Sequence, residues 1–260
     1  IRAEIIKAMA VLRPSGFFYL LHRTGLLSRI LPSLDRCAGL DGGPFHGETV
    51  FDHCMLVGDS LPPANPLLRF AGFVHDTGKF DAAGIKDGRI TYHGHETHTK
   101  SLERDLDRLR FSGKEKSYIL SLVRVHMRPL AEKTTPRSVR RLLSVLDEHG
   151  IAFREFLRMR IADKKGNLAK SPYALSDIRL RLKKIQDEIT TRVAFNLNDL
   201  ALTGSDIIDT LNIKPGPLVG RIKETLFEKV LETPGLNNKK DLVQILRTLD
   251  LEKLENEDVQ

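Results

Sequence analysis

Apolar residues recur at three- and four-residue spacing along almost the whole chain. The pattern is clearest in residues 1–12, 17–31, 117–126, 139–146 and 242–254. Such spacing gathers apolar side chains on one face of an α-helix. Alternating β-branched residues are nearly absent, apart from the short segment GRITYHG at residues 88–94. Because proline and glycine interrupt the pattern repeatedly, the sequence predicts an all-α fold of short helices joined by tight turns.

Three regions differ in character. Residues 1–45 predict a pair of neck-like helices, residues 46–165 hold most of the histidines, and residues 166–260 predict a helical body or tail. The formal net charge is +7, and residues 133–184 contain fourteen Lys and Arg against five Asp and Glu. This excess favours a polyanionic partner such as RNA, although solvated helix faces would give the same composition.

Several protein classes are disfavoured by the sequence. No apolar run approaches the roughly 20 residues needed to cross a bilayer, and the first residues lack the apolar middle of a signal peptide. The two cysteines, Cys37 and Cys54, cannot build a disulfide framework. We therefore expect a cytoplasmic protein. Because the chain begins with Ile1, we also expect a processed product, a fragment or a cloned piece.

The histidines cluster, with seven of the nine lying between residues 46 and 126. His53 lies within the apolar segment ETVFDHCMLV, His75-Asp76 follows LLRFAGFV, His126 ends SYILSLVRV, and Asp163 follows EFLRMRIA. Imidazoles and carboxylates at the ends of buried runs require partners, and a metal ion would supply one. Four predicted helices would thus direct ligands into a bundle core, which is typical of a metal site.

The order of these residues resembles the HD phosphohydrolase superfamily. The segment HDTGK resembles that family's doublet motif, and HGHETHT around His95 resembles its next element. The resemblance implies an HD-type helical bundle with metal-dependent phosphohydrolase activity. Its implied metal ligands are His53, His75, Asp76, His95, His126 and Asp163. By the same resemblance, the last two histidines of this set complete a second metal site or face the substrate phosphate.

The expected chemistry is hydrolysis of a phosphoester by an activated water. Imidazoles and two carboxylates leave a divalent ion positive enough to acidify a bound water. We expect one or two ions of Ni²⁺, Mn²⁺, Co²⁺, Fe²⁺ or Mg²⁺. A purely structural zinc site is disfavoured, because it needs only four ligands and this set has six. The predicted catalytic residues are Asp76, His95, His126 and Lys79. Lys79, Arg124 and Arg128 are candidate phosphate-side cations, and each could equally be an ordinary solvated side chain.

The two flanks of the chain resemble bacterial tRNA nucleotidyltransferases and poly(A) polymerases. Residues 1–34, with their GLL…ILP segment, are similar to the region after the catalytic head of that family. Residues 201–232 are similar to its C-terminal segment, in which a GIKPGP-like loop opens a helix, although Asn212 replaces the usual glycine. Lys214 and Gly216 could bind a phosphate there. A simple helix–helix turn would also explain them.

The resemblance implies an RNA substrate, held by basic helices that include Lys164 and Lys165. The leading hypothesis is a hydrolase of 2′,3′-cyclic or terminal phosphates on tRNA-like RNA. The sequence lacks the strand-borne Asp-x-Asp of a nucleotidyltransferase head, so we do not expect nucleotide addition from this chain alone. Two alternatives remain: a hydrolase of free or signalling nucleotides, and a non-catalytic tRNA-binding portion of a CCA-adding or poly(A)-polymerase enzyme whose head lies upstream.

Overall fold

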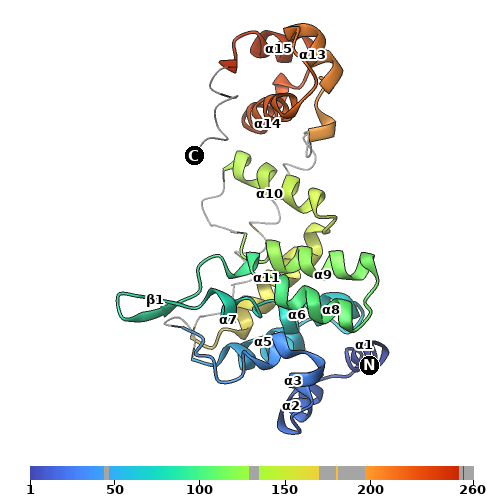
Figure 1. Cartoon of the computed structure of the whole chain (residues 1–260), viewed down its shortest axis with the longest axis vertical. Helices are drawn as coiled ribbons and strands as arrows, with labels where there is room; N and C mark the ends of the chain where they lie inside the picture. The colour runs from blue at the N-terminus through green and yellow to red at the C-terminus, as the bar shows by residue number, and fades with distance from the viewer. Residues whose placement is uncertain (44–46, 129–134, 170–179, 181–196, 252–253, 255–260) are drawn as a thin grey trace. The chain divides into compact units, whose positions relative to one another are not determined.

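The structure, a computed structural model, describes residues 1–43, 47–128, 135–169, 180, 197–251 and 254 (Figure 1). These residues form short helices and a single two-stranded hairpin, which confirms the predicted all-α fold class. The chain divides into two compact units, one of residues 1–129 and 149–175 and the other of residues 130–148 and 176–260. The predicted division into neck-like, histidine-bearing and tail regions stays a prediction.

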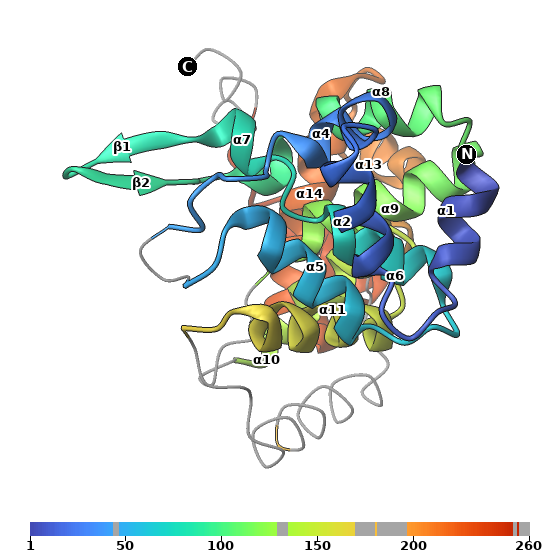
Figure 2. The ribbon, with the colours of Figure 1, turned by 90° about the horizontal axis from the view of Figure 1, so that it is seen from below.

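The first unit contains, in chain order, α1 (Arg2–Ala8), α2 (Ser15–Arg23), α3 (Leu27–Ile30), α4 (Pro32–Asp35), α5 (Val50–Ser60), α6 (Pro66–Val74), α7 (Lys79–Ala82), β1 (Gly84–Lys86), β2 (Arg89–Thr91), η1 (His95–Thr97), α8 (Lys100–Arg108), α9 (Gly113–Val125) and α11 (Phe153–Gly166). Helices α5, α6, α9 and α11 lie side by side and form its core (Figure 2). Helix α6 is central in this group, because it contacts each of the other three.

Two glycines allow α5 and α6 to approach closely. A Cβ atom on Gly58 would lie 2.4 Å from the ring of Phe73, and one on Gly72 would lie 2.5 Å from Leu61. Since real Cβ atoms do not come this near to other heavy atoms, larger residues would separate the two helices. This close packing fixes the positions of the side chains that α5 and α6 direct toward the site described below.

Side-chain caps set where the core helices begin. The hydroxyl of Thr49 accepts a hydrogen bond from the N–H of Asp52 at the start of α5, and Asn65 caps α6 ahead of Pro66. Ser112 and Glu115 form a capping box at the start of α9. Such caps satisfy backbone N–H groups that have no partner within the helix. They also fix the start of each helix, and with it the direction of the residues that follow.

The hairpin β1–β2 projects from the first unit (Figure 1). Its strands are antiparallel, with Ile85 paired to Ile90, and the turn residues Asp87 and Gly88 have φ of 50° and 70°. An Asp-Gly pair with two positive φ angles is the favoured two-residue hairpin turn. The hairpin coincides with the one segment of the sequence that lacked helical periodicity.

The second unit contains α10 (Pro136–Glu148), η2 (Leu197–Asp199), α13 (Gly204–Leu211), α14 (Pro217–Glu232), η3 (Pro234–Leu236) and α15 (Lys239–Leu246). Helix α14 contacts all the other elements of this unit. Its core comprises Leu200, Leu202, Ile207, Ile222, Leu226, Phe227, Val230, Leu231, Leu242 and Leu246. Asn212, with φ of 50°, ends α13 in the left-handed conformation. Asparagine tolerates this conformation better than most other residues that carry a side chain.

Part of the predicted basic stretch lies outside the described residues, namely residues 133–134, 170–179 and 181–184. Among the residues that the structure describes, no helix is both long and apolar enough to cross a membrane.

Candidate metal centre

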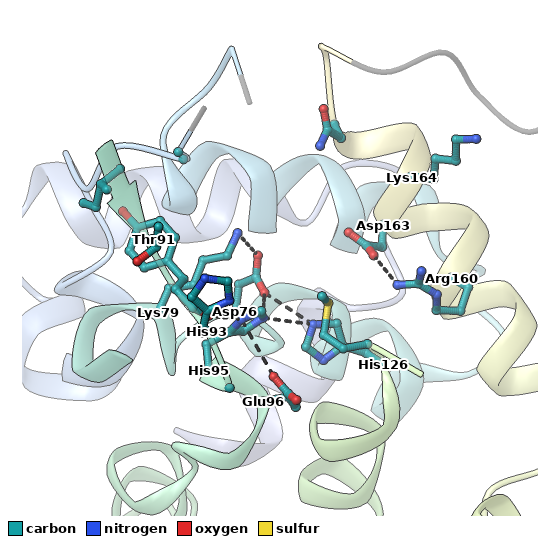
Figure 3. Close-up of a pocket in the computed structure, with 17 residues that line it drawn as sticks. Asp76, Lys79, Thr91, His93, His95, Glu96, His126, Arg160, Asp163 and Lys164 are labelled. Carbon is teal, nitrogen blue, oxygen red and sulfur yellow. Dashed lines mark hydrogen bonds and ion pairs between the residues drawn. The ribbon is translucent and has the colours of Figure 1, made fainter. Parts of the chain in front are cut away.

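Four helices of the first unit bring histidine and aspartate side chains to one buried cluster, of which Figure 3 shows Asp76, His95, His126 and Asp163. His75 and His126 are the C-terminal caps of α6 and α9, His53 lies within α5, and Asp163 lies near the end of α11. Asp76 directly follows the cap of α6. The three histidines and Asp76 are almost fully buried. The sequence predicted these residues at the inner ends of apolar runs; His75 and His126 end their helices, whereas His53 lies in the first turn of α5.

Three histidines are oriented in the same way. Nδ1 of His75, His95 and His126 each bonds the backbone carbonyl oxygen three residues earlier, at 2.9, 2.9 and 2.5 Å. A carbonyl oxygen only accepts, so we assign the proton of each neutral ring to Nδ1. In this tautomer, Nε2 carries no proton, and its lone pair is directed into the cluster. The arrangement is the one by which proteins orient histidine ligands toward a metal.

These lone pairs converge on the carboxylate of Asp76. Its Oδ1 atom lies 2.9 Å from Nε2 of His95 and 3.4 Å from Nε2 of His126, and the two Nε2 atoms are 3.3 Å apart. Nε2 of His75 is buried and makes no hydrogen bond with any described residue. Acceptors that face acceptors in a buried site require a cation or extra protons between them. The side chains therefore fit a divalent cation.

A second group of ligands adjoins the first. Nε2 of His53 lies 3.2 Å from Oδ1 of Asp163 and 3.7 Å from Oδ2 of Asp76. Two sets of side chains have ligand atoms within 4.8 Å of one another: His53, His75 and Asp163, and His75, Asp76 and His126. His75 is common to both sets, so the geometry accommodates either one ion or a pair. His95 joins the cluster through Asp76. The assignment of all six residues as metal ligands stays a prediction.

The electrostatics of the cluster suit a cation. Burial alone would raise the pKa of Asp76, but the adjacent His75 ring and the ammonium group of Lys79 hold that pKa well below its usual value. Burial lowers the pKa of His75 to about 3, so its imidazole is neutral at physiological pH. An ionised carboxylate beside a neutral imidazole is the protonation state that metal binding requires.

Lys79 supplies a fixed positive charge beside the cluster. Its Nζ atom lies 2.8 Å from Oδ2 of Asp76, and the side chain is almost fully buried. Burial would lower the pKa of Lys79, but Asp76 raises it above the usual value. Lys79 is therefore charged, and it lines the cavity described below.

Gly78 allows the Asp76 segment to pack against η1. A Cβ atom there would lie 2.2 Å from the carbonyl oxygen of His95 and 2.9 Å from that of His98. Both atoms belong to the backbone, so neither can rotate away. The close approach keeps His95 in contact with Asp76.

We expect Gly78→Ala to destabilise the first unit by about 1–3 kcal/mol, because the added methyl group overlaps a backbone oxygen. It should also weaken binding of Mn²⁺, since η1 must move and carries His95 with it. Thermal unfolding and metal titration measure the two effects. Gly16→Ala is the matched control, because nothing lies within 4 Å of a Cβ at that helical position. Equal behaviour of the two variants would contradict the proposed close approach.

A cavity of about 660 Å³ opens over the cluster. Its walls include Asp76, Lys79, His95, His126 and Asp163, together with other side chains that Figure 3 shows around the same space, among them Thr91, His93, Glu96, Arg160 and Lys164. The hairpin contributes Ile90 and Tyr92 as a less polar wall. This volume and this mixture of surfaces suit a nucleotide-sized ligand.

Two residues of this centre were missed in the sequence. Arg160 lines the cavity, and its Nη1 atom lies 2.9 Å from Oδ2 of Asp163. Oε1 of Glu48 lies 3.3 Å from Nδ1 of His53, where a carboxylate orients the ring. The three-residue spacing of Arg160 and Asp163 was a readable helical signal. No local pattern pointed to Glu48.

Most of the other predicted binding residues lie apart from this cavity. Arg124 and Arg128 line a separate recess of the first unit. Lys164 lines the metal cavity, whereas Lys165 lines another recess beside Leu12 and Tyr19. In the second unit, Lys214 and Gly216 are exposed, and Gly216 precedes the first residue of α14. The RNA-binding role of all these residues stays a prediction.

Fold and site together define an all-helical protein whose buried histidine and aspartate cluster is able to hold metal. No family model matches the chain. It is 29% identical over 219 residues to an A-adding tRNA nucleotidyltransferase of Deinococcus radiodurans, which covers 80% of this chain and 48% of that protein. It is 28% identical over 221 residues to a multifunctional CCA protein of Nitrosomonas europaea, and the match covers 80% of this chain and 53% of that protein. A multifunctional CCA protein of Methylobacillus flagellatus is 31% identical over 199 residues, and the match covers 70% of this chain and 46% of that protein.

The chain thus spans about half the length of the curated relatives it matches. The predicted similarity to tRNA nucleotidyltransferases is confirmed, and it extends over most of the chain. The relatives' names mention no HD domain and no hydrolase activity, so both remain predictions that rest on the residues of the cluster.

Proposed function

We propose that this chain is the helical, tRNA-binding portion of a tRNA nucleotidyltransferase-like protein. The observation that carries the proposal is the similarity to tRNA nucleotidyltransferases and CCA proteins over 70–80% of the chain. The nucleotidyltransferase head is proposed to belong to the half of those relatives that this chain does not match. The net charge of +7 supports an RNA partner, because cationic surfaces attract the phosphate backbone.

Binding of RNA is tested with a fluorescently labelled tRNA acceptor minihelix that ends in CCA. We expect affinity to fall steeply with salt, with a slope of roughly −0.7 to −0.9 for each phosphate contacted. A blunt RNA duplex of equal charge is the control, and it should bind more weakly because it lacks the single-stranded end. Absence of binding at low salt, or equal binding of both RNAs, would count against the proposal.

A second candidate function is metal-dependent phosphoester hydrolysis, and the convergence of Nε2 lone pairs on Asp76 favours it. When bound, a divalent ion would supply a nucleophile by lowering the pKa of water toward neutrality. The buried side chains of His53, His75 and His126, together with Asp76, would hold the ion. Lys79 and Arg160 lie on the cavity wall, where their charges would bind the substrate phosphate and offset negative charge that develops on it. The proposed substrates are 2′,3′-cyclic or terminal phosphates of RNA.

Hydrolysis is tested by loading the protein with Mn²⁺, Ni²⁺, Co²⁺ or Mg²⁺ and assaying 2′,3′-cyclic AMP and bis-p-nitrophenyl phosphate. Turnover with one of these ions is the expected result, and no turnover with any ion would leave only the RNA-binding function. Inhibition by added tRNA would assign the site to RNA ends. Efficient turnover of free nucleotides that tRNA does not inhibit would instead indicate a nucleotide or signalling-nucleotide hydrolase.

A further inference from the structure

A second recess adjoins the metal cavity in the first unit. Its volume is about 520 Å³, and Arg124, Arg128 and His149 line it together with Thr97. Glu96 and Met127 line both this recess and the metal cavity, so the two spaces share a wall. A ligand longer than one nucleotide could therefore occupy both.

The end of α9 and the segment of η1 each contribute residues to both cavities. At the end of α9, His126 faces the metal cluster, while Arg124 and Arg128 line the recess. Residues two positions apart on a helix point to different sides, so Arg124 does not share the direction of His126, and Arg128 lies beyond the end of α9. In η1, His95 likewise faces the cluster, and Thr97 lines the recess.

The recess is positively charged and partly organised. Nη2 of Arg124 donates to the hydroxyl oxygen of Thr99 at 3.2 Å, and Thr99 is itself almost fully buried. Neither Arg124 nor Arg128 forms an ion pair with any residue that the structure describes. The carboxylate of Glu96 lies on the shared wall, 3.9 Å from Nδ1 of His95. Two arginines that line one recess offer the kind of donors that bind a phosphate anion.

We propose that this recess binds the phosphodiester one nucleotide before the terminal nucleotide held in the metal cavity. The inference rests on the proposed function and deepens it. It makes the preferred ligand the end of an RNA strand, since a free nucleotide would fill the metal cavity and leave both arginines without a phosphate. The arginines then select substrate length and take no part in the reaction at the terminal phosphate.

The test compares ligands of different length on the full chain. A 5′-labelled trinucleotide and a mononucleotide, each with a terminal phosphorothioate that is hydrolysed slowly, are titrated against wild type and the double variant Arg124→Ala/Arg128→Ala. We expect the trinucleotide to bind the double variant roughly tenfold to a hundredfold more weakly, since charged hydrogen bonds are lost. The mononucleotide should change less than twofold. The salt slope for the trinucleotide should fall by about 0.7, which corresponds to one phosphate contact.

Two further variants make the result specific. Arg154→Ala removes an exposed arginine from the first turn of α11 and should leave both ligands unaffected. Arg124→Lys/Arg128→Lys keeps the charge and should recover part of the lost affinity. Equal loss for mononucleotide and trinucleotide, or no loss beyond that of Arg154→Ala, would overturn the recess assignment alone. If the wild-type protein fails to bind the trinucleotide, both the recess assignment and the proposed RNA-binding function are overturned.

Discussion

Asp76→Asn is expected to reduce phosphoester hydrolysis on the order of a thousandfold and to lower the metal content of the purified protein. Asp76 is the centre of the cluster, because His95, His126 and Lys79 all lie within 3.4 Å of its carboxylate. The amide has nearly the same shape but no charge, and its NH₂ group cannot act as a ligand. Steady-state assays and elemental analysis measure the two effects on the same preparation.

Asp87→Asn is the matched control for this substitution. Asp87 is exposed at the hairpin turn with φ of 50°, which asparagine adopts readily, so activity and metal content should be unchanged. Circular dichroism establishes that both variants are folded, a necessary check because the amide no longer neutralises the buried Lys79. A folded Asp76→Asn protein that retains wild-type turnover would show that hydrolysis occurs elsewhere or does not depend on this cluster.

Much of the fold was readable from local sequence. The capping box of Ser112 and Glu115 marks the start of α9, and the Asp87-Gly88 turn marks the hairpin. The division into compact units was not readable. Helix α10 belongs to the second unit, whereas α11, which follows it directly, returns to the first. An amphipathic pattern shows which face of a helix is apolar, but it does not identify the partner on which that face packs.

Histidine and aspartate side chains were expected to gather here because burial and charge conflict in the sequence itself, and their role as metal ligands stays a prediction. The side chains of His75 and Asp76 follow an apolar helix, and burying their polar atoms without a partner would be unfavourable. The surroundings of the cluster were predicted less well. Arg124 and Arg128 were grouped with Lys79 by their distance from His126 along the chain, although helical geometry places residues two positions apart on different sides. Glu48 reaches His53 from the segment before α5, and such contacts depend on the path of the backbone.

A buried arginine ties the N-terminal segment to the core of the first unit. The Arg69 side chain on α6 is 2% exposed. Its Nη1 atom donates to the carbonyl oxygens of Met9 and Val11, each at 2.7 Å, and Nη2 donates to that of Leu12 at 2.9 Å. Nε donates to the carbonyl oxygen of Gly58 on α5 at 3.2 Å. One guanidinium group thus donates hydrogen bonds to the irregular backbone after α1 and connects that segment to α5 and α6.

Arg69→Ala should therefore lower the free energy of unfolding by at least about 3 kcal/mol, because several buried carbonyl oxygens lose their donor together. For a chain of this size, that corresponds to a fall in Tm of roughly 6–12 °C. Arg104→Ala, at an exposed position of α8, is the control and should change stability by less than about 0.5 kcal/mol. Arg69→Lys retains the charge with fewer donors and should be intermediate. Denaturant unfolding measures all three variants, and an Arg69→Ala protein within 1 kcal/mol of wild type would mean that the backbone after α1 finds other partners, such as water.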